Sequence, residues 1–222
     1  MKIERITDRL TAQIPNELSI VGYWPPNSKP ENEVPIYHVS SSQAFNQVIG
    51  YAKFINSSNG TVLYRGQNKN YDSLLPSGTR NGKISVPDTT INAIRNDKHT
   101  TKFFGLNSPD INGWERYQSI LIESVLQHYG ANTYCMDFVD NHWCALWFGL
   151  YKFVDNHYIK RVAQNEKLYI YLYLADTNGA CIRGMYIGED TYTVDLRKAL
   201  PSTFSRPAAQ HGWIVRKHRR EE

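Results

Sequence analysis

Several features that would classify a protein at once are missing from these 222 residues. The three cysteines are an odd number and form no Cys-x-x-Cys pair, which argues against a disulfide framework or a structural zinc site. No stretch approaches the roughly 18–20 apolar residues of a membrane span, and the first ten residues lack the apolar segment of a secretory signal. We therefore expect a soluble, cytoplasmic protein that makes no membrane contact.

Four common enzyme signatures are also missing. These are the glycine-rich dinucleotide and P-loop motifs, the Gly-x-Ser-x-Gly nucleophile elbow and the His-Glu-x-x-His zinc motif. The seven histidines are scattered, and His128 and His142 are too far apart to form a local metal pair, so we expect no metal. Cys135 or Cys144 could pair with His128 as a nucleophile. Cys144, however, lies in an apolar run where a small buried side chain is the better interpretation.

The composition predicts one domain with a packed core. Hydrophobic residues make up 41% of the chain and aromatic residues 13%. The formal net charge is +4, which is compatible with a nucleic-acid partner without requiring one. We divide the chain into an N-terminal irregular or helical extension at residues 1–39, a domain at 40–216 and a basic tail at 217–222.

Hydrophobic periodicity places helices early in the chain and strands late. About 35 residues at the start are expected to be irregular, and residues 76–113 mostly loops with a short helix near 89–97. Ser41 or Ser42 caps a helix whose residues Phe45, Val48, Ile49 and Phe54 share a face. The remaining predicted elements are a strand at 61–66, a helix at 114–129 stopped by Gly130, a strand at 133–138, a buried helix at 142–154, a strong strand at 167–175 and weaker strands at 191–196 and 211–216. This order favours an α+β fold in which N-terminal helices pack on a mixed or antiparallel sheet.

Three short polar segments are candidates for chemistry. Arg65 ends a predicted strand, and Gly66 after it lets the backbone turn, which suits a phosphate or diphosphate; a surface salt bridge is the alternative. Thr133 and Asp137 have the same parity on a strand and are expected to share a face near His128. These polar groups either line a site or bond one another and a backbone loop to fix the turn.

The third segment brings Arg206, Gln210 and His211 together before Gly212 and the final strand. Gln210 could orient a sugar hydroxyl or cap a turn, because a neutral amide is not a strong base.

Taken in order, these segments resemble the FRG domain, a family named for its Phe/Tyr-Arg-Gly motif. That motif is Tyr64-Arg65-Gly66 here, with Gln67 after it. The second hallmark, similar to LQHxGxPTRLLDWTxSPxxALxFA, is matched by Leu126, Gln127, His128, Gly130, Thr133, Asp137, Ala145, Leu146 and Phe148. The third hallmark, an arginine-rich stretch leading to AQxGxF, is similar to the segment with Arg206, Ala209, Gln210, Gly212 and Trp213. Asn132, Tyr134 and Val139 stand where the family has proline, arginine and threonine.

The order of these motifs is also similar to ADP-ribosyltransferases of the Arg-Ser-Glu type. That resemblance implies an ADP-ribosyltransferase-like fold, with NAD as substrate held by Tyr64, Arg65, Gly66 and Gln67. It implies that Thr133 and Asp137 lie in the pocket, that His128 orients them, and that Gln210 sits where the late glutamate is expected. Glutamine cannot carry the negative charge of that glutamate, so Asp137, Glu115 or Glu123 would have to supply it.

Three functions follow as hypotheses. The first is an NAD-dependent ADP-ribosyltransferase, a glycosyltransferase acting as a toxin or phage-defence effector on nucleic acid or protein, with an antitoxin protein as a further partner. The second is a nuclease that uses His128, Asp137 and His211 around a phosphate held by Arg65. The third is a non-catalytic module that binds a nucleotide.

Overall fold

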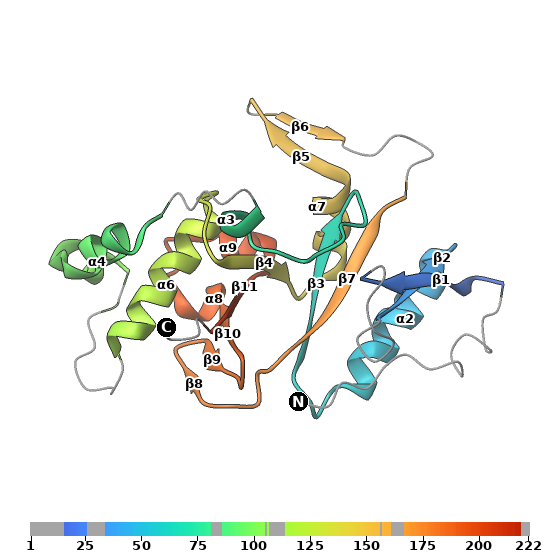
Figure 1. Cartoon of the computed structure of the whole chain (residues 1–222), viewed down its shortest axis with the longest axis horizontal. Coiled ribbons are helices and arrows are strands. Elements are labelled where there is room, and N and C mark those ends of the chain that lie inside the picture. Colours follow the sequence, from blue (N-terminus) through green and yellow to red (C-terminus); the bar gives the residue numbers. More distant parts are fainter. Residues whose placement is uncertain are drawn as a thin grey trace.

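The computed structural model describes residues 16–25, 34–80, 86–104, 106, 114–155, 157–160 and 167–218. Its centre is a seven-stranded sheet in the order β7-β3-β4-β11-β10-β9-β8 (Figure 1). Every pair of neighbouring strands is antiparallel. The strands are β3 Thr61–Gln67, β4 Cys135–Val139, β7 Tyr169–Ala175, β8 Cys181–Ile182, β9 Met185–Ile187, β10 Thr191–Asp195 and β11 Gly212–Lys217. The fold is therefore α+β, as predicted, with an antiparallel sheet.

Two short ribbons accompany the main sheet. β1 (Leu18–Trp24) pairs with β2 (Val34–Val39), so the prediction of an irregular first 35 residues is wrong for this segment. The ribbon forms because Leu18 packs into a small core with Val48, which the hydrophobic pattern of either strand alone does not reveal. β5 (Tyr151–Val154) pairs with β6 (His157–Lys160), and this hairpin projects away from the rest of the domain (Figure 1).

Eight helices lie within the described residues. They are α2 Ser42–Ile55, α3 Ser77–Arg80, α4 Asp88–Asn96, α5 Lys98–Phe103, α6 Trp114–His128, α7 His142–Leu150, α8 Leu196–Ala199 and α9 Ser205–Gln210. Ser41 caps α2 by accepting the N–H of Ala44, and Gly130 follows α6 with φ of 99°, both as predicted. Phe54, however, is 75% exposed, so its assignment to the buried face of α2 is wrong.

The predicted helix at 142–154 is shorter than expected. α7 stops at Leu150 because Tyr151 is extended and begins β5, whose backbone pairs with β6. The helix is also only partly buried, since Trp143 is 52% exposed and Trp147 is 36% exposed. A uniformly apolar run therefore conceals both a helix end and an exposed helix face.

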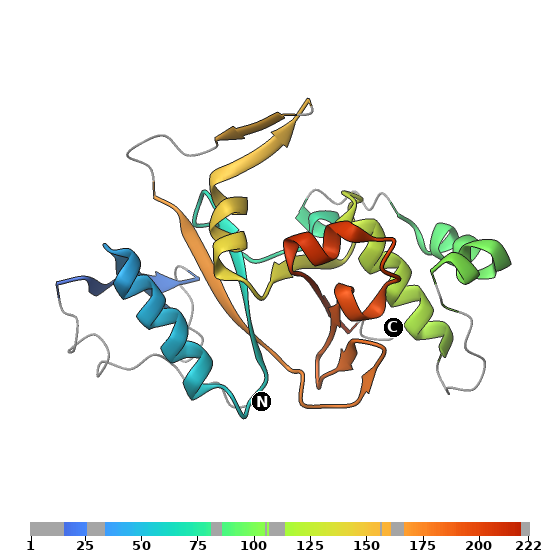
Figure 2. The ribbon, with the colours of Figure 1, turned by 180° about the vertical axis from the view of Figure 1, so that it is seen from behind.

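Two of the hydrophobic clusters on the sheet are covered by helices, and a third joins β3, β4, β7 and β11. Helices α2 and α7 cover the same side of β3 and β7 (Figures 1 and 2), while α6 packs on β4, β10 and β11. β3 pairs with β7 along its whole length but meets β4 only where Tyr64 lies opposite Val139. The two halves of the sheet therefore diverge beyond this position, next to Arg65.

No helix among the described residues is both long enough and apolar enough to cross a membrane.

Candidate functional site

A cleft of about 380 Å³ lies where β3 and β4 diverge. Its walls come from all three polar segments singled out in the sequence. Its lining residues include Tyr64, Arg65, Gly66 and Gln67 of the first segment, Gln127, His128, Asp137 and Val139 of the second segment, and Arg206 and Gln210 of the third segment. Residues more than 140 positions apart along the chain, such as Arg65 and Arg206, thus border one cavity.

Arg65 crosses the opening between the diverging strands. Its Nη1 donates a hydrogen bond to the backbone carbonyl oxygen of Asp137 at 2.6 Å. This bond joins β3 to β4 at the level where the backbone ladder has ended, and it fixes the guanidinium at the cleft wall. Arg65 therefore lines the cleft, and its Nη1 donates to a carbonyl rather than to a carboxylate.

Gly66 has a different role from the predicted turn. It lies inside β3, which continues to Gln67, and a Cβ at this position would come within 1.7 Å of the Ala145 carbonyl oxygen. Glycine is needed because the backbone of α7 passes directly against the strand. The close approach places Ala145 and Phe148 of α7 in the cleft wall.

Asp137 is held by the two polar residues at the end of α6. Gln127 donates from Nε2 to Asp137 Oδ2 at 2.7 Å, and His128 Nδ1 lies 3.5 Å from Asp137 Oδ1. The Asp137 side chain is 40% exposed, so a held carboxylate still reaches the cleft. Gln127 and His128 therefore each contact one oxygen of the Asp137 carboxylate.

Thr133 supports this network from behind the cleft. Its side chain is completely buried, donates to Gln127 Oε1 at 2.7 Å and accepts the backbone N–H of Cys135 at 3.0 Å. The prediction that it shares a strand face with Asp137 is wrong, because β4 begins only at Cys135. Thr133 is absent from the cleft wall and fixes the amide of Gln127 instead.

The cleft rim is basic. Arg206 and Arg80 border it with Arg65, whereas Asp137 is the one carboxylate among the lining residues that the structure describes. Gln210, at the end of α9, accepts a hydrogen bond from Arg206 Nε at 3.3 Å. The excess of guanidinium groups over carboxylates favours an anionic ligand.

Several buried polar atoms of cleft residues make no hydrogen bond within the described part of the chain, and three of them are relevant to a ligand. They are the Tyr64 hydroxyl, Gln67 Oε1 and His128 Nε2. Burial, and secondarily the charge of Asp140, raise the pKa of Tyr64, so its hydroxyl stays protonated and can donate. A buried polar atom without a partner is costly, and a bound ligand with both donors and acceptors would satisfy these three.

Of the three residues that differ from the motif pattern, two line the cleft and one does not. Val139 and Asn132 line the cleft, whereas Tyr134 does not, and its backbone N–H donates to Glu123 Oε1 at 2.9 Å. Glu123 is 3% exposed and paired with Arg216, and Glu115 is 82% exposed at the start of α6. Neither glutamate lines the cleft, so Asp137 is its carboxylate within the described part of the chain.

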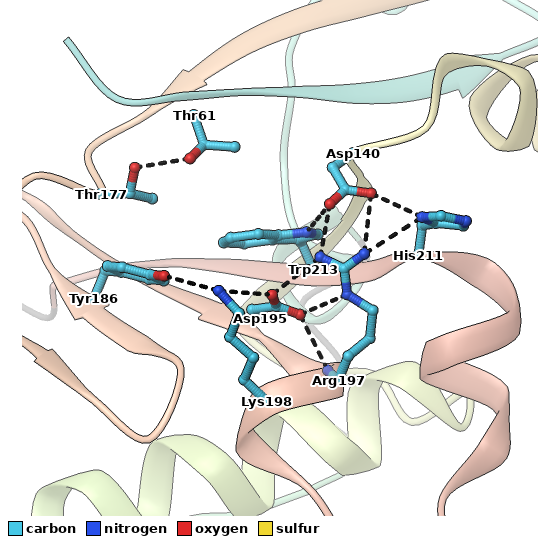
Figure 3. A network of polar contacts seen from close by, with 9 residues as sticks. All are labelled: Thr61, Asp140, Thr177, Tyr186, Asp195, Arg197, Lys198, His211 and Trp213. Carbon is cyan, nitrogen blue, oxygen red and sulfur yellow. Dashed lines mark hydrogen bonds and ion pairs between the residues drawn. The ribbon is translucent and has the colours of Figure 1, made fainter. Parts of the chain in front are cut away.

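A second polar network beside the cleft gave no signal in the sequence. Asp140 follows β4 and receives hydrogen bonds from Arg197 Nη2 at 2.6 Å and Trp213 Nε1 at 3.1 Å, with His211 Nδ1 at 3.0 Å (Figure 3). Burial alone would raise the pKa of Asp140, but these hydrogen bonds outweigh it and hold the pKa below its usual value. His211 therefore belongs to this network rather than to the cleft wall.

Among the residues described, no three His, Cys, Asp or Glu side chains are grouped so as to hold a metal ion.

Residues 60–157 match the family model of the FRG domain. This span contains the Tyr64-Arg65-Gly66 motif and the second motif, from Leu126 to Phe148, while the third motif follows it. No curated protein and no solved structure matches the chain.

Proposed function

The chain carries an FRG domain at residues 60–157, and on that premise we propose that its cleft binds NAD and transfers ADP-ribose to an acceptor. The acceptor class is nucleic acid or protein, and the biological role is that of a toxin or phage-defence effector kept in check by an antitoxin protein. The observation that carries the proposal is the meeting of Arg65 and Asp137 in one cleft, joined by the hydrogen bond from Nη1 to the Asp137 carbonyl.

The cleft suits part of a dinucleotide. Its volume of about 380 Å³ falls within the roughly 300–1,000 Å³ typical of small-molecule sites. The three guanidinium groups of Arg65, Arg80 and Arg206 offer forked donors for a diphosphate. The unpartnered hydroxyl of Tyr64 and amide oxygen of Gln67 are suited to the amide or hydroxyl groups of nicotinamide riboside.

The chemistry assigned to the cleft is substitution at C1′ of the nicotinamide ribose. The bond from C1′ to the nicotinamide nitrogen breaks, and its electron pair leaves with nicotinamide. A nucleophilic oxygen or nitrogen of the acceptor then bonds to C1′ and loses its proton. Positive charge develops on the ribose between these events, and the Asp137 carboxylate is the negative group in the cleft that can stabilise it.

This assignment moves the charged role from Gln210 to Asp137. Gln210 bonds to Arg206 and can position a ribose hydroxyl, whereas Asp137 carries the charge and is held by Gln127 and His128. Residues that fix a charged group before the reaction reduce the reorganisation that the transition state requires.

A non-catalytic nucleotide-binding module is the second candidate. The observation in its favour is that both Asp137 oxygens already have partners, one in Gln127 and one in His128. A carboxylate neutralised by a protonated His128 would stabilise a ribosyl cation poorly. Such a protein would bind NAD and release it unchanged.

Binding and turnover should be measured separately. NAD binding is measured by calorimetry, and turnover by release of nicotinamide and transfer of label from NAD in cell extract. We expect Asp137→Asn to bind NAD within a few-fold of wild type and to lose about 10²–10³-fold in turnover, because asparagine keeps the Gln127 hydrogen bond but not the charge. Arg65→Ala should lose binding, and Arg95→Ala, outside the cleft, should change neither quantity.

Each outcome discriminates. A wild-type protein that binds NAD without consuming it supports the binding module. A wild-type protein that does not bind NAD refutes the proposal, and RNA or DNA cleavage in the absence of NAD would favour the nuclease.

A further inference from the structure

A second cavity, of about 430 Å³, lies between α4, α6 and the strands β10 and β11. The described residues that line it are all different from those that line the cleft. Its polar lining residues are Asp88, Asn92, Arg116, Ser119, Glu123, Tyr192, Arg216 and His218. None of them belongs to the motifs of the cleft.

Arg216 gives this cavity its character. It is 9% exposed, and its Nε donates to Glu123 Oε2 at 2.6 Å. That bond is the one that the Arg216 side chain makes to the described residues, and Arg216 lines the cavity. A guanidinium group presents five N–H donors in a planar fork, and a buried one needs acceptors for them.

His218 adds a second unsatisfied group on the same wall. Its Nε2 is buried without a hydrogen-bond partner in the described part of the chain, while its ring lies 4.3 Å from the Tyr192 ring. The ring contact holds the imidazole in place. Protonated or as the Nε2–H tautomer, His218 would be a further donor into the cavity.

The Glu123 carboxylate is already occupied by hydrogen bonds from the protein. Glu123 uses Oε2 for Arg216 and Oε1 for the backbone N–H of Tyr134. Asp88 lies on the α4 side of the cavity, in the first turn of that helix. Both Glu123 oxygens therefore already accept hydrogen bonds from the protein, whereas His218 Nε2 has no partner among the described residues.

We propose that this cavity binds a small anionic molecule through a phosphate or carboxylate group, with Arg216 and His218 as its contact residues. Two anionic oxygens of the ligand would accept hydrogen bonds from the terminal amino groups of Arg216, which is how guanidinium groups bind phosphate and carboxylate in other proteins. Arg116, on the α6 wall, adds a positive charge. The site is independent of the proposed function, because it shares no residue with the cleft.

The test measures binding of radiolabelled orthophosphate and of citrate to the full chain by equilibrium dialysis at constant ionic strength. Arg216→Lys keeps the charge opposite Glu123 but removes the fork, and we expect it to weaken binding about tenfold or more. His218→Phe keeps the ring contact with Tyr192 and removes Nε2, and it should weaken binding several-fold. Comparison of orthophosphate with citrate shows which acceptor group the site prefers.

Arg65→Ala is the control for anions bound in the cleft, and it should leave this binding unchanged. Binding that is lost in Arg65→Ala and kept in both cavity variants would place the anion in the cleft and overturn the proposal. Absence of binding by the wild type would overturn it as well. Circular dichroism and melting temperature establish that each variant is folded; should Arg216→Lys not fold, His218→Phe decides.

Discussion

Replacement of Gly66 by alanine tests the most demanding contact of the site. The added Cβ would lie 1.7 Å from the Ala145 carbonyl oxygen and 2.7 Å from its carbonyl carbon. To reach the 3.4 Å at which ordinary van der Waals contact begins, the oxygen contact would have to lengthen by about 1.7 Å. Both partners are backbone atoms in regular elements, so no side-chain rotation can relieve the clash.

The expected cost of Gly66→Ala is therefore about 3 kcal/mol or more, at or beyond the upper end for overpacked cores. Urea unfolding followed by circular dichroism measures it. Gly50→Ala is the matched control: this position lies within α2 with nothing within 4 Å of the added Cβ, so it should gain up to about 1 kcal/mol. A Gly66→Ala protein as stable as wild type would refute the close packing of α7 on β3.

Two further predictions concern pH. Asp140→Asn should lower the free energy of unfolding at pH 7 by about 1–3 kcal/mol, since it removes charged hydrogen bonds from Arg197 and Trp213. Because the folded pKa of Asp140 is depressed, this stability is present above its ordinary value of 3.8 and is lost as pH falls through the folded pKa. Urea unfolding at pH 7 and pH 3 should show the gap between the two proteins closing; a constant gap would contradict the assignment. Burial, and secondarily the charge of Lys53, lower the pKa of His142 from 6.5 in the folded protein. The unfolded chain therefore binds the proton more readily, and the free energy of unfolding falls as pH drops below about 6.5. His142→Phe should flatten this decline in unfolding curves between pH 5 and 7.5, and an unchanged slope would exclude His142 as its source.

Local patterns predicted most of the individual elements. Neighbouring residues are enough to predict the serine cap of α2, the glycine after α6 and the apolar spacing of both helices. The relative importance of the strands was not predicted. β7, the run richest in aromatic and β-branched residues, is an edge strand that pairs with β3 alone among the described strands. β11, in contrast, is buried from Gly212 to Arg216 at the centre of the sheet.

The predictions that the structure corrected, and the contacts that were not predicted, share a cause: they depend on segments that are distant in sequence. Arg216 and Glu123 are 93 positions apart, and Arg197 and Asp140 are 57 apart, so no spacing rule connects them. Thr133 was assigned by strand parity although the strand begins two residues later. Parity and periodicity describe one element at a time and do not show which other element will cover it.

The three motifs are joined by packing as well as by the cleft. Gly66 of the first motif allows contact with Ala145 of the second, and a Cβ on Gly212 of the third would lie 3.0 Å from Cε1 of His128. Both glycines therefore serve backbone and side-chain proximity, which an inactive domain would need as much as an active one. Arg65 also donates one hydrogen bond to the backbone carbonyl oxygen of Asp137, which is a structural bond. A match to these motifs thus predicts the shape of the cleft more directly than its chemistry. The proposed chemistry depends instead on the charge of Asp137. Asparagine keeps an oxygen for the Gln127 hydrogen bond and loses the charge, so Asp137→Asn separates an enzyme from a binding domain where Arg65→Ala does not.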